Sequence, residues 1–304
     1  KELQMNKIRN IFVTMIFLAS FSFSQDLTPF SGPVDFNDIW DSDMLITGKV
    51  TIEDGVILTI SPGVTVYFAR LDQDEDGIGD IDFIINGTLS ADGVTFTSYS
   101  LYQGETPQSN DWQGIDYITP SDGMPSGLVN TQIHYAHQGL YINGNSMTVN
   151  NLEIANGSDY GVHIENSFST TSLNNISIIN NGGWGISIDN GQVAINGALI
   201  FGNGSFGLKV ESPVILEVDD AIVSSNGSTG IWIDGAQNSL FTGVRSVSNG
   251  GDGILIEGAS PSFSNSSISS NAGIGINIRE SSSNASFDYC DIINNVGGVA
   301  VYDG

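Results

Sequence analysis

The chain has 304 residues, of which 34 are Asp or Glu and 8 are Lys or Arg, giving a formal net charge of −26. This charge favours solubility and cation binding, and it argues against nucleic acids and anionic membranes as partners, because both are bound through Lys and Arg. The single cysteine, Cys290, excludes an intramolecular disulfide framework.

The first predicted element is a secretory signal peptide. Lys7 and Arg9 form a basic head after Met5, and an apolar run extends over residues 11–23. We place the cleavage before Gln25, so residues 1–24 comprise the signal peptide and four residues upstream of Met5. The apolar run is short and polar sequence follows it, so we expect no membrane span in the mature chain. The sequence therefore predicts a protein that is secreted or at the cell surface, with a net charge of −28 after cleavage.

Short alternating strands are predicted next. Residues 46–52, 55–60 and 63–68 alternate in polarity, and the turn signals Asp54-Gly55 and Pro62-Gly63 separate them. Further strands are expected at 83–85, 87–89, 94–97 and 112–117, with a polar loop at 98–110. We expect residues 25–128 to form a lead-in and the first, irregular coils of a repeat structure.

An acidic loop at residues 72–82 interrupts these strands. Its spacing matches an EF-hand-like calcium loop, with Asp at positions 1, 3, 5 and 9 and Gly77 at position 6. Position 12 is Phe83, where a bidentate Glu is expected. The sequence predicts calcium here, and a solvated acidic hairpin is the alternative. The candidate ligands are Asp72, Asp74, Asp76, Ile78 (through its carbonyl), Asp80 and Asp82.

From Gly139 onwards the pattern Gly-aliphatic-x-aliphatic occurs eight times, with its glycines 22 to 24 residues apart. These anchor glycines are Gly139, Gly161, Gly185, Gly207, Gly230, Gly253, Gly275 and Gly298. A constant period of this length indicates stacked repeats, and the period-2 alternation indicates that each repeat consists of strands. About 22 residues accommodate three short strands and three turns. The prediction is an all-β, right-handed parallel β-helix with three sheets and about eleven coils of 22–25 residues, regular over residues 129–304.

The repeat predicts three columns of stacked side chains. The aliphatic residues should point inward and form two buried columns. One consists of Ile186, Leu208, Ile231, Ile254 and Ile276, and the other of Ile188, Val210, Ile233, Ile256 and Ile278. Four residues before the anchor glycine stand Asn181, Asn203, Asn226, Asn249, Asn271 and Asn294. These asparagines form either a hydrogen-bonded ladder or ordinary Asn-Gly turns, and both place a corner there.

Two further columns should point outward. Position x reads Tyr141, His163, Ser187, Lys209, Trp232, Leu255, Asn277 and Ala300. The residue after the second aliphatic reads Asn143, Glu165, Asp189, Glu211, Asp234, Glu257, Arg279 and Tyr302. Five acids in consecutive coils repel one another by about 1 kcal/mol per neighbouring pair in water, which favours compensating cations. Trp232 is the only Trp expected on an outward position of the repeats.

One set of segments carries a family resemblance: Trp40, Ile46-Thr-Gly48, residues 58–68, 86–91 and 96–98, Trp112-Gln-Gly-Ile115, Ile133-His-Tyr-Ala136 and Gly139-Leu140. In these segments the chain resembles secreted bacterial right-handed β-helix proteins, typically surface proteins of the Bacteroidetes type. The pectate-lyase-like scaffold that this resemblance implies carries lyases, hydrolases, epimerases and non-catalytic adhesins, so it predicts the fold and leaves activity open. The sequence ends directly after a predicted strand, and we expect further coils beyond Gly304.

For function, we predict a structural, adhesive or glycan-binding rod without catalytic activity. The expected glycan-binding residues are Trp232, Glu211, Asp234, Glu257 and Arg279. The alternative is a polysaccharide lyase or glycoside hydrolase that uses Asp234, Glu257 and Arg279. A walled cleft with a raised carboxylate pKa would favour the enzyme, and a flat, loop-free sheet would favour the rod.

Overall fold

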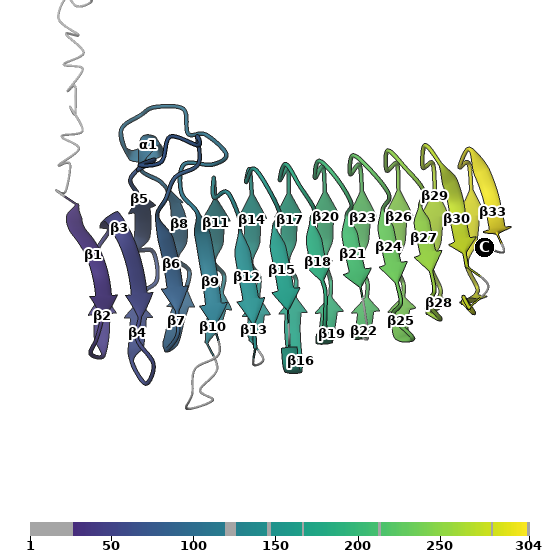
Figure 1. The fold of residues 1–304 in the computed structure, drawn as a ribbon, viewed down its shortest axis with the longest axis horizontal. Coiled ribbons are helices and arrows are strands. Elements are labelled where there is room, and N and C mark those ends of the chain that lie inside the picture. Colours follow the sequence, from purple (N-terminus) through teal and green to yellow (C-terminus); the bar gives the residue numbers. More distant parts are fainter. Residues whose placement is uncertain are drawn as a thin grey trace, which may run out of the picture.

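The computed structural model describes residues 27–118, 126–144, 147–165, 167–211, 214–280 and 282–302. The predicted signal peptide lies outside these residues. The described chain is a right-handed parallel β-helix, in which eleven strands of one sheet mark eleven successive coils (Figure 1). All described strand pairs are parallel, and the only helix among the described residues is the short α1 (Tyr99–Tyr102), within the predicted polar loop. No helix of the described part is long and apolar enough to cross a membrane.

Each regular coil contributes one strand to each of three sheets. The repeat sheet, which contains the Gly-aliphatic-x-aliphatic strands, consists of β6 (Asp82–Ile85), β9 (Gly114–Ile118), β12 (Leu140–Asn143), β15 (Val162–Glu165), β18 (Ile186–Ile188), β21 (Leu208–Glu211), β24 (Ile231–Asp234), β27 (Ile254–Glu257), β30 (Ile274–Arg279) and β33 (Gly297–Tyr302).

The second sheet consists of β2 (Asp38–Trp40), β4 (Ile57–Ile60), β7 (Thr88–Asp92), β10 (Gly127–Val129), β13 (Thr148–Asn150), β16 (Ser167–Asn174), β19 (Gly191–Asn196), β22 (Val214–Asp219), β25 (Asn238–Thr242), β28 (Ser262–Ser264) and β31 (Ser286–Asp288).

The third sheet consists of β5 (Thr65–Phe68), β8 (Thr95–Ser98), β11 (Gln132–His134), β14 (Glu153–Ala155), β17 (Ser177–Ile179), β20 (Leu199–Phe201), β23 (Ile222–Ser224), β26 (Arg245–Val247), β29 (Ser267–Ser269) and β32 (Asp291–Ile293). The first coils are less regular: β1 (Thr28–Val34) pairs with β3 (Met44–Ile52), and β3 contributes to both the third sheet and the repeat sheet.

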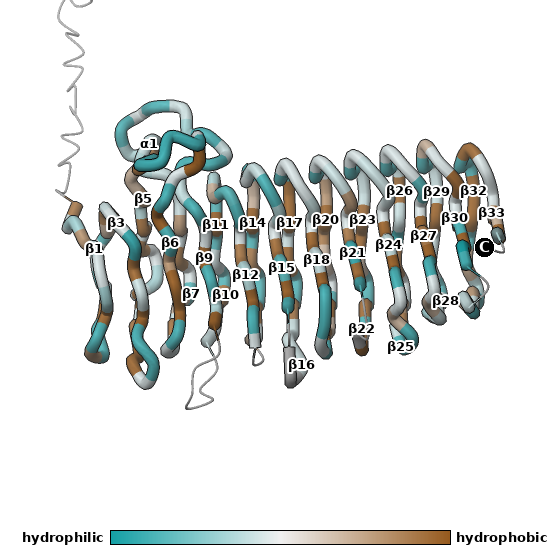
Figure 2. The backbone as a smooth tube through the Cα atoms, viewed as in Figure 1, coloured by the Kyte–Doolittle hydropathy of each residue, from teal (hydrophilic) through white to brown (hydrophobic). Residues whose placement is uncertain are grey.

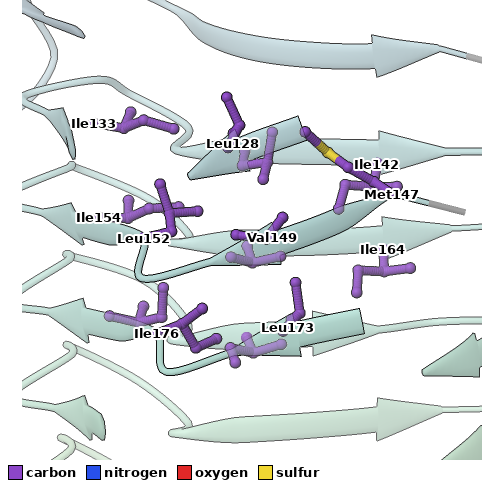
Figure 3. Packing of buried hydrophobic residues seen from close by; sticks show 14 of the residues in the cluster. Leu128, Ile133, Ile142, Met147, Val149, Leu152, Ile154, Ile164, Leu173 and Ile176 are labelled. Atoms are coloured by element: carbon purple, nitrogen blue, oxygen red, sulfur yellow. The ribbon is translucent and has the colours of Figure 1, made fainter. Parts of the chain in front are cut away.

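The two predicted aliphatic columns are confirmed. Strand register places Ile186, Leu208 and Ile231 opposite one another, and each is fully buried. The second column is equally buried except for Ile278, which is partly buried and packs against the core. Apolar and polar residues alternate along the strands in Figure 2, and apolar side chains from successive coils pack against one another in Figure 3. Because burial of one such side chain contributes roughly 1.5–3 kcal/mol, these columns hold neighbouring coils together.

The predicted asparagine column is a hydrogen-bonded ladder. The side chain of Asn203 donates from Nδ2 to Oδ1 of Asn226 at 3.0 Å, and Asn226 donates in the same way to Asn249. Each Nδ2 also donates to a backbone carbonyl, so these buried amides are paired.

Asn294 was wrongly placed in this ladder. The last member is Asn295, whose Oδ1 accepts hydrogen bonds from both the backbone N and Nδ2 of Asn271. In the final coil the turn to the repeat sheet is one residue shorter, so the corner falls one residue later. Asn294 instead has a φ of 59°. The corner's left-handed residue precedes the ladder position, as Ser270 precedes Asn271 with a φ of 59°.

The anchor glycines are required by close approach of neighbouring coils. At Gly185 a Cβ would lie 2.4 Å from Cγ2 of Ile200 and 2.5 Å from the carbonyl oxygen of Gly207. The glycine therefore lets the turn after the third sheet pack directly on the next coil.

Candidate functional site

The outer face of the repeat sheet carries both predicted outward columns, and part of it is covered. Ser187 and Asn277 are buried, and the side chains of Glu165, Asp189, Asp234 and Glu257 are half-buried. The covering side chains come from the position directly before the anchor glycine, which is aromatic in three consecutive coils: Tyr160, Trp184 and Phe206. The signal for this aromatic column is present in the sequence, since each of the three residues directly precedes an anchor glycine.

These aromatic side chains contact column x. The ring of Tyr160 lies 5.1 Å from that of His163, and the ring of Phe206 lies 5.0 Å from that of Trp232. The expectation that Trp232 is the only Trp on this face was wrong, because Trp184 reaches the face from the turn before its glycine. Together with Trp232, the turn residues Trp184 and Phe206 form an aromatic row on the outer face of the sheet.

Lys209 is enclosed within this row. Its Nζ lies 4.4 Å from the ring centroid of Trp184 and 5.5 Å from that of Trp232, and it is ion-paired with Glu211. The residue is 8% exposed. Because the two indoles and one carboxylate compensate its charge, Lys209 joins the aromatic row to the acidic column.

The predicted glycan-binding residues lie next to one another around Trp232. Its Nε1 donates to Oε2 of Glu257 at 2.8 Å, and Nη1 of Arg279 donates to Oε1 of the same carboxylate at 3.3 Å. Both oxygens of Glu257 are therefore engaged, and the indole of Trp232 is held in a fixed orientation.

Beside this group lies an acidic hollow of about 440 Å³, lined by Asp189, Glu211, Asp234 and Gly235. Burial raises the pKa of Asp234, the negative charges of Glu257 and Glu211 raise it further, and Lys209 opposes them. The hollow therefore favours ligands that donate hydrogen bonds or carry positive charge.

A second group of titratable side chains lies towards the N-terminal end of the same face. Tyr141 donates its hydroxyl to Oε2 of Glu165 at 2.5 Å, and Nε2 of His163 lies 2.9 Å from Oδ2 of Asp189. The ligand atoms of His163, Glu165 and Asp189 lie within 4.8 Å of one another, a spacing that a cation could bridge. Burial, with the charge of Glu165, raises the pKa of Tyr141 to about 12.

Asp116 occupies position x of β9, opposite Tyr141 on β12. Burial raises its pKa to about 6, the charge of Asp82 adds to this, and Lys49 opposes it. A carboxyl group with such a pKa can exchange a proton near neutral pH. Asp116 was not among the predicted site residues, because its coil departs from the regular spacing: Gly114 lies 25 residues before Gly139.

The acidic loop brings three of its predicted calcium ligands together. Carboxylate oxygens of Asp72, Asp74 and Asp80 lie within 4.8 Å of one another. Oδ1 of Asp72 is buried and has no hydrogen-bond partner among the described residues. Asp76 instead accepts a hydrogen bond from the backbone N of Ile78 at 2.7 Å. Asp82 lies on β6, where it is 3.7 Å from Nζ of Lys49.

Comparison with known proteins agrees with this architecture. Residues 213–304 match the family described as "Right handed beta helix region". No curated protein matches the chain. The chain is similar to the solved structure of the periplasmic alginate epimerase AlgG, with 13% identity, a TM-score of 0.64, and coverage of 91% of this chain and 77% of that chain.

It is also similar to the A-module of the mannuronan C-5 epimerase AlgE4 of Azotobacter vinelandii. Here the identity is 13% and the TM-score 0.58, with coverage of 88% of this chain and 90% of that chain. At this identity the similarity establishes the fold alone, and that fold is a right-handed parallel β-helix.

Proposed function

We propose that the outer face of the repeat sheet, from β18 to β30, binds an extended glycan without cleaving it. The observation that carries the proposal is the row of half-buried aromatic side chains Trp184, Phe206 and Trp232 beside the acidic hollow. Sugar rings stack on aromatic side chains through their C–H faces, and their hydroxyl groups donate to carboxylates.

The charge on this face selects among glycans. The column over Asp189, Glu211, Asp234 and Glu257 is acidic, while Lys209 and Arg279 are already paired with carboxylates. A polyanionic sugar chain would be repelled unless cations bridged it to the sheet. We infer that neutral glycans bind directly. The predicted signal peptide supports a location outside the cytoplasm, as a secreted or cell-surface rod.

The Trp232→Ala variant tests the glycan-binding face. We expect its affinity for a neutral polysaccharide to fall about tenfold or more, because the stacking surface is lost while the buried columns remain intact. Affinity electrophoresis and a glycan array on wild type and variant provide the measurement. Leu240→Ala is the matched control, since Leu240 lies on β25 of the same coil and is 46% exposed on another sheet. Equal binding by wild type and Trp232→Ala would remove the proposed site.

The group around His163 favours a second candidate function, a polysaccharide-modifying enzyme. Asp116, Tyr141 and His163 place an acid of raised pKa, a phenol and an imidazole on one face in three adjacent coils. The two similar structures are named as an alginate epimerase and a mannuronan C-5 epimerase. By contrast, both oxygens of Glu257 in the alternative set Asp234, Glu257 and Arg279 are already engaged. Epimerised, unsaturated or shortened products from alginate or a neutral polysaccharide, abolished in His163→Ala, would establish this function in place of simple binding.

We also propose that the loop of residues 72–80 binds calcium through Asp72, Asp74 and Asp80. Their closeness supports this, as does Oδ1 of Asp72, which has no hydrogen-bond partner in the part of the chain that the structure describes. Calorimetric titration should give a dissociation constant on the order of 0.1–1 mM, and Asp74→Asn should weaken binding at least about tenfold. Glu75→Gln is the control, because Glu75 lies in the same loop outside the group. Absence of heat at millimolar calcium, or equal loss in both variants, would contradict the assignment.

A further inference from the structure

Two long connections build a lobe on one corner of the solenoid. In regular coils the third sheet passes to the repeat sheet through a short turn such as residues 135–139. In two consecutive early coils this turn is replaced by residues 69–81 and 99–113, the second of which contains α1. Figure 1 shows these connections projecting together above β5 and β8. Insertions at one corner of a repeat architecture commonly carry a binding function.

The two connections are hydrogen-bonded to each other. Nδ2 of Asn110 donates to the carbonyl oxygen of Gly77 at 2.5 Å, and the backbone N of Gly79 donates to the carbonyl oxygen of Asn110 at 2.8 Å. At Gly79 a Cβ would lie 2.1 Å from the carbonyl oxygen of Asp111, so only glycine permits this contact. The lobe is therefore a fixed structure and not a pair of independent loops.

A buried carboxylate organises the second connection. Asp111 is fully buried, and its Oδ2 accepts hydrogen bonds from Oγ of Ser98 at 2.5 Å, Oγ of Ser100 at 3.2 Å and the backbone N of Gln108 at 3.0 Å. Its Oδ1 has no hydrogen-bond partner among the described residues and lies 3.7 Å from Nε of Arg70. These contacts orient the chain on both sides of α1 before any ligand arrives, which lowers the entropic cost of binding.

The lobe lines one half-open cavity of about 590 Å³, within the range of small-molecule sites. Its lining is almost entirely polar and includes Arg70, Tyr99, Gln103, Thr106, Gln108 and Asp111. Tyr99 is the aromatic residue of this lining, and its ring stacks on that of Tyr102 at 5.6 Å. Tyr102 in turn contacts Tyr67 of β5 at 5.2 Å, so the solenoid wall supports the aromatic pair.

We propose that this cavity is a saccharide site that holds one neutral hexose unit. Amide side chains offer donors and acceptors side by side, as vicinal hydroxyl groups require, and Tyr99 offers a ring for stacking. The charge of Arg70 is opposed by Asp111 and by Glu105 in the same lining, so the cavity offers no excess positive charge to an anionic sugar. This site lies on the lobe, and its residues are different from those of the glycan-binding face. The two proposals are therefore independent of each other.

Saturation-transfer NMR with the methyl glycosides of glucose, galactose and mannose tests the proposal, with glucuronate as the anionic comparison. We expect at least one neutral glycoside to bind with a dissociation constant on the order of 1 mM. Tyr99→Leu and Gln108→Ala should each weaken binding about tenfold without changing the melting temperature of the protein, because both side chains line the cavity and Asp111 keeps its backbone contact.

Two controls separate this site from other effects. Leu101→Ala changes an exposed residue of α1 that does not line the cavity, and it should bind like wild type. Leu240→Ala, which changes an exposed residue of β25 outside the cavity lining, should also bind like wild type. Absence of transfer to every neutral glycoside, preference for glucuronate, or wild-type affinity in both cavity variants would overturn the proposal.

Discussion

Ile233→Asp should lower the free energy of unfolding of the central coils by roughly 5 kcal/mol. Ile233 is fully buried on β24, between Val210 and Ile256 of the neighbouring coils. The substitution removes the apolar contacts of one rung and places a carboxylate in the core, where it has no partner. Because each coil contacts only its neighbours, the damage should be greatest next to β24.

Hydrogen exchange followed by mass spectrometry measures the protection of the backbone amides in each coil and so tests this expectation. Exchange should accelerate in the coils of β21, β24 and β27 before it does so at β6 or β9. Leu240→Asp is the matched control, because Leu240 belongs to the same coil and is 46% exposed. It should change stability by less than about 0.5 kcal/mol. Similar protection in both variants would show that the inward column does not carry the stability of the coil.

Asn226→Ala should lower the free energy of unfolding by roughly 4 kcal/mol, which is more than the loss of a typical single hydrogen bond. Oδ1 of Asn226 accepts from both the backbone N and Nδ2 of Asn203, each at 3.0 Å. Its Nδ2 donates to the carbonyl oxygen of Ile200 and to Oδ1 of Asn249. The substitution therefore leaves buried donors and an acceptor without partners, and each such group costs about 1–3 kcal/mol.

Asn196→Ala offers the same chemistry in a solvated position. Asn196 donates from Nδ2 to Oδ1 of Asn174 at 2.9 Å, but it is exposed, so water replaces the lost contact. Urea unfolding measures the free energy of unfolding of both variants. It should fall by roughly 4 kcal/mol in Asn226→Ala and by less than about 1 kcal/mol in Asn196→Ala. Equal losses would show that burial does not set the strength of the ladder.

The repeat period of the sequence predicted the position of most regular residues. In a solenoid each residue contacts the equivalent residue one coil away, so aliphatic residues at the same position of every repeat stack in one column. Two aliphatic residues two positions apart on a strand point to the same face, so they start two neighbouring inward columns. Ile186 and Ile188 could therefore be placed correctly before any coordinates. The ladder followed from the same period until the final coil, where a turn shortened by one residue moved the position from Asn294 to Asn295.

The candidate sites were less predictable, because they depend on turns and insertions that the period does not describe. The acidic column was visible as a sequence pattern, yet the enclosure of Lys209 by Trp184 and Trp232 arises only when a turn residue of one coil reaches over the strand of the next. Likewise, the composition of the loop predicted a group of carboxylates near Asp72. The cavity beside Tyr99 was not predictable, because it forms where two separate insertions meet at one corner. The sequence by itself determined the coil and its inward columns, since their spacing is local and periodic. Only the tertiary structure decided which aperiodic side chains meet across coils, because no regular spacing relates them.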